Sequence, residues 1–391
     1  MSNLIDRIEV PGPKKLLALD GGGIRGMITV EVLAKIEDLL RSQRQGSPNF
    51  VLADYFDYVA GTSTGAIIAA CIALGMSVAE IRELYENQGS AMFDKASLLR
   101  RFQYKYEDEK LAAMMRQLIR DRADVTGAAG TVPIERTSDG DPTLGSPALR
   151  TLLMMVMRNA TTDSPWPVSN NPKAKYNDRG RADCNLVAPL WQLVRASTAA
   201  PVYFPPEMVK FGSKEFVFVD GGITPYNNPA FQLFLMATLE PYCLRWTARE
   251  KDMLLVSIGT GTSPQANANL DPSEMNLIYN MGSIPSALMY AALSEQDLLC
   301  RAFGRCIAGE PLDREIGNLC DVKGPVEPRL FTYARYNAEL SREGLDALGL
   351  NDIDPKSVQK LDSVQHIADL QRVGRSVADR RVSASHFKGF P

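Results

Sequence analysis

Histidine is nearly absent from this chain of 391 residues, which contains only two, His366 and His386. Any reaction that needs a histidine base must recruit one of these side chains from the last 26 residues. Both lie in polar stretches of helical character, where a solvated surface position is the simpler interpretation. The sequence therefore gives little support to chemistry that depends on histidine.

Long hydrophobic runs are also missing. The longest strongly apolar stretches, Ala66–Met76 and Leu152–Met157, fall well short of the ~20 residues that a membrane-spanning helix needs. Charged residues interrupt the first twelve positions, so no apolar core of a signal peptide is visible. We therefore expect no transmembrane helix, no export and a cytoplasmic protein.

Cysteine usage and charge exclude two further classes. The six cysteines include no Cys-x-x-Cys pair, which disfavours a structural zinc site and indicates reduced thiols. Lys and Arg number 43 against 46 Asp and Glu, a net charge of −3. This balance gives no general attraction to a nucleic-acid polymer.

Two strand–turn–helix units open the chain. Lys14–Asp20 has the apolar pattern of a short buried strand, and a helical pattern runs from Met27 to Leu40. Tyr55–Ala60 is a second expected strand, which leads into a small-residue helix at Ala66–Leu74. Repetition of this unit predicts a mainly parallel sheet with helices on both faces.

The length allows one large domain or two ordinary ones. We see no repeat and no clean linker, so we expect a single domain over residues 1–391, with a core at about 14–340. A loop or lid insert is expected at about 121–185, because Thr161–Asp183 is a long polar connector. A helical segment at about 341–391 completes the expected organisation.

The sharpest chemical motif is Gly61-Thr62-Ser63-Thr64-Gly65, a G-x-S-x-G between the second strand and its helix. A nucleophilic serine needs its oxygen at the apex of a strained strand-to-helix turn, with small neighbours that avoid clashes. The N-terminus of the following helix favours developing negative charge. An ordinary Gly/Ser/Thr loop is the alternative interpretation, and the position between strand and helix favours the nucleophile.

A glycine-rich loop, Asp20–Gly26, follows the first strand. It satisfies G-x-G-x-x-G, but the acidic residue that dinucleotide binding needs some 20 residues later has no counterpart at a strand end. Consecutive glycines expose successive backbone N–H groups, so the loop is a candidate oxyanion hole. Arg25 could hold the loop in shape or contact an anionic head group.

The third motif is Asp220-Gly221-Gly222, directly after an expected strand. At the carboxyl end of a parallel strand, Asp220 would lie at the edge where α/β sheets place their sites and could accept a serine proton. A turn-capping role is the alternative. We interpret Ser197, in a helical stretch, as a packing or structural residue.

Together these stretches resemble the patatin-like phospholipases. The glycine loop, the elbow, the Ala196–Pro201 stretch and the Asp-Gly-Gly motif occur in family order, over roughly residues 14–265. The resemblance implies a three-layer α/β/α sandwich and a Ser63–Asp220 catalytic dyad, with no metal and no cofactor. It also implies an oxyanion hole formed by Gly21, Gly22, Gly23 and Arg25.

The implied activity is hydrolysis of fatty-acyl esters in membrane phospholipids, by a phospholipase A or lysophospholipase in peripheral contact with the membrane. Leu149–Met157 and Trp166 are candidates for that contact, although the apolar segment could equally be a buried strand or helix. Two alternatives stay open: an esterase of the α/β-hydrolase type that uses a histidine, and a non-catalytic module that binds lipid or nucleotide. The sequence leaves homo-oligomerisation open.

Control by a ligand is a further expectation. Some bacterial proteins that this chain resembles stay inactive until a cyclic nucleotide made during phage infection binds them, which implies a role in antiviral defence. Arginine suits bidentate phosphate contacts. The candidate ligands are Arg329, Arg335, Arg372, Arg375, Arg380 and Arg381, for which an ordinary solvated surface is the alternative.

Overall fold

A mixed β-sheet forms the centre of the computed structural model, which describes residues 2–44, 46–93, 105–128, 133–201, 204–262 and 277–391. Within these ranges nine strands take the order β5-β6-β3-β2-β1-β7-β9-β8, with β4 also paired to β3. The strands are β1 (Lys14–Leu19), β2 (Tyr58–Thr62), β3 (Leu152–Asn159), β4 (Ser164–Ser169), β5 (Glu207–Phe211), β6 (Lys214–Asp220), β7 (Met253–Ile258), β8 (Arg305–Ala308) and β9 (Thr332–Tyr336).

Most neighbouring strands run parallel. The pairs β3–β2, β2–β1, β1–β7, β7–β9 and β9–β8 are parallel, whereas β4 and β6 pair antiparallel with β3, and β5 with β6. Leu19, Gly61 and Ile258 lie in one row of the register, so the loops after β1, β2 and β7 meet at one edge.

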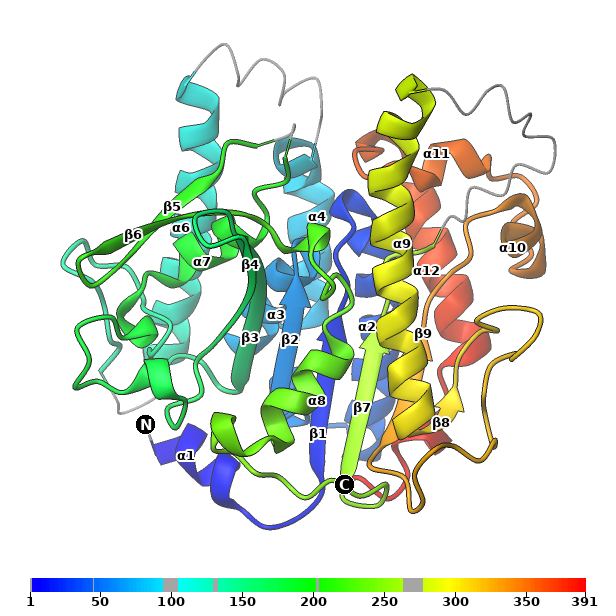
Figure 1. Cartoon of the computed structure of the whole chain (residues 1–391), viewed down its shortest axis with the longest axis horizontal. Helices are drawn as coiled ribbons and strands as arrows, with labels where there is room; N and C mark the ends of the chain where they lie inside the picture. The colour runs from blue at the N-terminus through cyan, green and yellow to red at the C-terminus, as the bar shows by residue number, and fades with distance from the viewer. Residues whose placement is uncertain (1, 45, 94–104, 129–132, 202–203, 263–276) are drawn as a thin grey trace.

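Helices cover both faces of the sheet, with α8 and α9 on the near face in Figure 1 and α2, α3 and α12 on the far face. Leu17 and Leu19 of β1 join the core under α2 and α3, while Leu16 and Ala18 join the core under α8. This alternation is what a strand covered on both sides requires. The helices are α1 (Ser2–Glu9), α2 (Gly26–Gln43), α3 (Thr64–Ala73), α4 (Val78–Phe93), α6 (Lys105–Ala128), α7 (Leu190–Ser197), α8 (Ala230–Thr238), α9 (Leu277–Phe303), α10 (Arg342–Ala347), α11 (Pro355–Gln359) and α12 (Ile367–Arg381).

The expected three-layer α/β/α fold, its mainly parallel sheet and its helical C-terminal region are therefore confirmed. The division into one domain stays our proposal. None of the helices in the described ranges has the length and apolar character to cross a membrane.

The expected lid insert at 121–185 is not one loop. Helix α6 continues to Ala128, and β3 is a buried strand between β2 and β6. The apolar residues of Leu152–Met157 show no alternation because both faces of the strand are covered. Trp166 on β4 packs against Phe216 and Phe218, with ring centroids 5.0 and 5.3 Å apart. Neither segment is therefore an exposed membrane anchor, which corrects that expectation.

Candidate active site

Ser63 occupies the turn between β2 and α3. Its backbone has φ 55° and ψ −123°, a conformation that a residue with a side chain adopts only when its surroundings impose it. The Ser63 N–H donates to the Ser197 hydroxyl at 3.0 Å, and that hydroxyl donates to the Val156 carbonyl at 2.6 Å. Ser197 thus ties the strained turn to β3, in the structural role that the sequence indicated for it.

The turn also depends on the residues beside Ser63. A Cβ atom on Gly65 would collide with the backbone carbonyls of Leu19 and Asp20. Glycine therefore lets α3 begin directly against the end of β1, which brings Ser63 next to the glycine loop.

Asp220 is the hydrogen-bond partner of Ser63. The Ser63 hydroxyl donates to Asp220 Oδ2 at 2.6 Å, and the Gly222 N–H donates to Oδ1 at 2.6 Å. The carboxyl group is buried, and burial raises its pKa to about 6, against the opposing effect of these two hydrogen bonds. The structure thus brings together the two residues that the family resemblance implied as a pair.

The strand that carries Asp220 differs from the expectation. β6 runs antiparallel to β3, not parallel, and their paired residues extend only from Met157 opposite Asp220 to Asn159 opposite Phe218. Met157, which pairs with Asp220, directly follows Val156, which pairs with Thr62 of β2. The Asp220 end of β6 therefore still lies beside the end of β2, next to Ser63. A strand's direction is not encoded in its own six or seven residues, so the sequence could not reveal it.

The glycine loop lies against Ser63. A Cβ on Gly21 would collide with Asn227 Oδ1 and would lie 3.2 Å from the Ser63 Cβ, so glycine permits this close approach. The Gly21 N–H donates to the Asn227 carbonyl at 3.1 Å. The N–H groups of Gly22 and Gly23 have no hydrogen-bond acceptor within the described ranges, which leaves them available as oxyanion donors.

Asn227 is a residue of the site that no motif in the sequence marked. Besides its carbonyl contact with Gly21, its side-chain Oδ1 is buried without a partner and faces the positions where Gly21 and Gly222 would carry a Cβ. Thr260 holds the other side of the loop, because its hydroxyl donates to the Gly21 carbonyl at 2.8 Å.

Arg25, the fourth predicted oxyanion residue, contacts the C-terminal segment. Its guanidinium donates to the Gln359 carbonyl at 3.3 Å, and the neighbouring Ile24 N–H donates to the Leu361 carbonyl at 3.0 Å. Burial lowers the pKa of Arg25 to about 10. These contacts support the alternative that Arg25 holds the loop in shape.

A buried ion pair supports the start of the same loop. The Arg335 guanidinium on β9 donates to both oxygens of Asp20, at 2.8 and 2.5 Å, and to the Ser257 hydroxyl at 2.7 Å. Both partners are almost completely buried. Burial raises the Asp20 pKa, and the charge of Arg335 opposes that rise.

Five of the six arginines expected to bind a nucleotide have acidic partners within the chain. Arg335 is committed to Asp20, Arg372 pairs with Asp352 at 2.7 Å, and Arg375 pairs with Glu31 at 3.1 Å. Arg329 contacts the Ala302 and Val322 carbonyls and Glu327, and Arg381 contacts Glu310 and the Asn337 carbonyl. These partners within the chain give the arginines a structural role, and a phosphate site in this segment stays a prediction.

The two histidines have other partners. His366 Nδ1 lies 3.3 Å from Asp369, and His386 Nδ1 shares a hydrogen bond of 2.7 Å with the Tyr336 hydroxyl. No hydrogen bond in the described part of the chain joins either ring to Ser63 or Asp220. The geometry thus favours a dyad over a triad that contains histidine.

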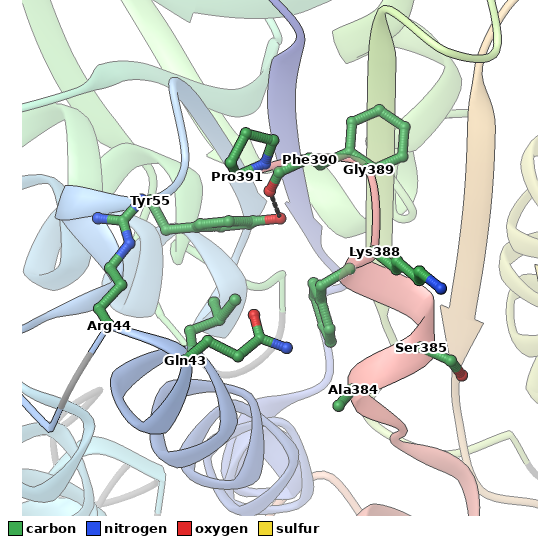
Figure 2. Close-up of a pocket in the computed structure, with 11 residues that line it drawn as sticks. Gln43, Arg44, Tyr55, Ala384, Ser385, Lys388, Gly389, Phe390 and Pro391 are labelled. Carbon is green, nitrogen blue, oxygen red and sulfur yellow. Dashed lines mark hydrogen bonds between the residues drawn. The ribbon is translucent and has the colours of Figure 1, made fainter.

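A hollow lies at the amino ends of the strands, opposite the end where Ser63 lies. Figure 2 shows it between Tyr55 and the last residues of the chain, where the Tyr55 hydroxyl donates to the Phe390 carbonyl at 2.8 Å. Lys15, at the start of β1, donates to the Pro391 carbonyl at 2.9 Å. This hollow of about 530 Å³ therefore belongs to the amino ends of the strands, away from Ser63.

The residues that the structure describes contain no group of three or more His, Cys, Asp or Glu side chains placed to hold a metal ion.

Known proteins with similar sequences include phospholipases and patatins. A cGAMP-activated phospholipase from Vibrio cholerae serotype O1 is 28% identical over 63% of this chain and 64% of its own length. An intracellular phospholipase A2 from Caenorhabditis elegans is 32% identical over 64% of the chain and 20% of its own length. Patatin-T5 from Solanum tuberosum is 26% identical over 64% of the chain and 61% of its own length. The chain spans less than two thirds of each of these relatives.

The family model described as patatin-like phospholipase matches residues 17–234, more than half of the chain. This range contains the glycine loop, the Ser63 turn and Asp220. The chain therefore belongs to the patatin-like phospholipase family.

Proposed function

We propose that this protein hydrolyses fatty-acyl ester bonds of membrane phospholipids, with Ser63 as nucleophile and Asp220 as general base. The observation that carries the proposal is the 2.6 Å hydrogen bond from the strained Ser63 hydroxyl to the buried Asp220 carboxylate. The phospholipases among its relatives support the substrate class.

The first half of the reaction is acylation. Asp220 accepts the Ser63 proton as the serine oxygen attacks the acyl carbonyl, and the N–H groups of Gly22 and Gly23 bind the oxyanion. The positive end of α3 adds to this stabilisation because Ser63 is its N-cap. The protonated Asp220 then supplies a proton to the departing lysolipid oxygen.

The second half is deacylation. Asp220, again ionised, takes a proton from water as the water oxygen attacks the acyl-serine. It then returns that proton to the Ser63 oxygen as the acyl–oxygen bond breaks, which releases the fatty acid and restores the serine hydroxyl and the Asp220 carboxylate. A carboxylate with a pKa of about 6 is a stronger base than an ordinary aspartate and is still mostly ionised at pH 7.

The direct experiment labels the purified chain with a fluorophosphonate and measures the lipids released from mixed phospholipid vesicles by mass spectrometry. Ser63→Ala and Asp220→Ala should each lower turnover by at least about a thousandfold, and the double variant should be no worse than either, because both side chains act in one step. Normal turnover in Asp220→Ala, or labelling away from Ser63, would remove the dyad.

We also propose peripheral contact with the membrane at the rim beside Asp220. Ile223, Leu288 and Tyr290 are large apolar residues that stay exposed, by 44%, 65% and 39%. The side chain of their neighbour Met289 on α9 comes within 3.7 Å of where Gly222 would carry a Cβ, so α9 passes next to the Asp220 turn. Aromatic and aliphatic side chains favour the lipid interface.

A matched pair of variants on α9 tests this contact. Leu288→Glu should lower vesicle hydrolysis at least tenfold and leave hydrolysis of a monomeric short-chain ester unchanged. Leu298→Glu, at a position that is 40% exposed and ten residues further along the helix, is the control that should change neither rate. Equal loss on both substrates would point to damage at the site rather than to lost membrane contact.

Activation by a cyclic nucleotide, in the setting of antiviral defence, is the last part of the proposal. Its support is that similar chains from Vibrio cholerae and Escherichia coli are cGAMP-activated phospholipases. The test is vesicle hydrolysis with and without a panel of cyclic di- and trinucleotides. Full activity without any nucleotide, and no response to the panel, would end this part while leaving the dyad intact.

A further inference from the structure

Two cysteines far from the dyad lie side by side. Cys306 on β8 and Cys320 have their sulfur atoms 3.4 Å apart, with no covalent bond between them. Their backbones form an isolated parallel bridge, and residues paired in this way have a Cα separation close to 5 Å. That separation lies within the range that a disulfide accepts, so a bond needs only a change in side-chain torsion.

The connecting loop, residues 309–319, is held at both ends by one arginine. Arg301 on α9 donates to the Glu310 carbonyl at 2.6 Å and to the Asn318 carbonyl at 2.8 Å. The same guanidinium pairs with Asp297 at 2.8 Å and is almost fully buried. The loop therefore cannot move away from α9 without breaking these hydrogen bonds.

The backbone around Cys320 is held in an unusual conformation. Leu319 and Asp321, on either side, both have positive φ angles, of 52° and 59°. The Cys320 N–H donates to Asn318 Oδ1 at 3.0 Å. A strained turn of this kind persists when its surroundings fix it, and here it keeps the Cys320 sulfur against Cys306.

We propose that Cys306 and Cys320 are a modification site, at which a peroxide-class oxidant forms a reversible intramolecular disulfide. Cys320, which is partly exposed, attacks one peroxide oxygen as its thiolate, the O–O bond breaks, and a sulfenic acid and water result. The Cys306 sulfur then attacks the sulfenic sulfur, forming the S–S bond and releasing a second water. In sum, two thiols and one hydrogen peroxide give one disulfide and two waters.

Burial assigns the order of the two steps. Cys306 is buried, and this raises the pKa of its thiol, so it is a poor first attacker and serves as the resolving partner. A thiol reductant reverses the reaction by attack on the exposed Cys320 sulfur.

The Cys306–Cys320 disulfide would restrict the loop that lines one side of a cavity. Glu310 and Leu312 of the loop line a hollow of about 420 Å³ together with Arg335, which pairs with Asp20 of the glycine loop. Closing the ring removes conformational freedom from the unfolded chain, so the oxidised protein should melt roughly 3 °C higher than the reduced protein.

The experiment treats the purified full chain with hydrogen peroxide, blocks remaining thiols, and maps the peptides by mass spectrometry without reduction. The expected product is a peptide pair joined through Cys306 and Cys320, lighter by two hydrogen atoms and separated by dithiothreitol. Cys320→Ser should abolish both the cross-link and the rise in melting temperature. Cys243→Ser is the matched control. Cys243 is exposed, and within the described ranges its thiol hydrogen-bonds only to the Pro241 carbonyl, so this variant should keep both the cross-link and the rise in melting temperature.

Two results would overturn the proposal. One is the absence of the Cys306–Cys320 pair at a peroxide dose that oxidises Cys243. The other is a cross-link of equal yield that joins Cys320 to a different cysteine.

Discussion

At the scale of single residues, Asp220 combines two opposed demands. Its burial disfavours the charged form, while hydrogen bonds from Ser63 and Gly222 favour it, and the pKa settles at about 6. A general base works best when its pKa lies near the working pH, because it is then both ionised and basic. The two hydrogen bonds thus keep Asp220 suited to the role of general base that we propose for it at neutral pH.

The pH dependence of the reaction follows from this pKa. Activity requires ionised Asp220, so kcat/KM on a monomeric ester should rise with pH, pass its midpoint near pH 6 and level off above pH 7. The measurement is a kcat/KM profile between about pH 4.5 and 8.5. A midpoint near pH 4, where an ordinary aspartate ionises, would show that Asp220 is not held in the buried state seen here.

The free energy of unfolding should fall as the pH rises, whereas kcat/KM should rise. The pKa of Asp220 is about 6 in the folded chain and near 3.8 when unfolded, so the folded state binds more protons between these values and loses stability as the pH rises through them. Asp220→Asn removes the buried charge and should raise the free energy of unfolding at pH 7 by up to about 3 kcal/mol. Thermal melts at pH 7 and below pH 4 check this, because the gain should disappear at the lower pH.

At the scale of elements, the site depends on how closely α3 approaches β1. Gly65→Ala would place a Cβ against the carbonyls of Leu19 and Asp20, so α3 must move away and carry Ser63 from Asp220. We expect a loss of about 1–3 kcal/mol in unfolding free energy and a fall in kcat beyond the loss in stability.

The control for this prediction is Gly180→Ala. Gly180 is exposed, and its added Cβ would meet only the Asp178 side chain, at 3.3 Å. A Gly65→Ala variant with the rate and melting temperature of Gly180→Ala would contradict the close approach of α3.

The elements that the sequence predicted are those with a local signature. The strands at β1 and β2 and the turns after them follow from short apolar runs that end in glycines. β3 was ambiguous because a strand covered on both faces has no alternation, and the direction of β6 depends on its pairing with β3. The glycine turns marked Ser63 and Asp220 as candidates, and the family resemblance implied that they act as a pair.

At the scale of the whole molecule, several residues that position the site lie outside the range that matches the family model. The family model ends at residue 234, yet Arg335, Gln359 and Leu361 all contact the glycine loop or the residues beside it. No motif marks these contacts, because they join positions more than 300 residues apart. Sequence patterns therefore pointed to the proposed dyad and missed the scaffold that positions it.

The C-terminal part contains both histidines, and we expect neither of them to take part in the reaction. His366 pairs with Asp369 and His386 with Tyr336, contacts that glutamine can replace in part. Replacing both histidines with glutamine should therefore keep kcat/KM on phospholipid vesicles within about threefold, a barrier change of ~0.6 kcal/mol. The variant is compared with the parent chain at equal folded fraction. A loss of a hundredfold or more at an unchanged melting temperature would mean that a histidine takes the proton of Ser63, and Asp220 would then act by orienting that ring.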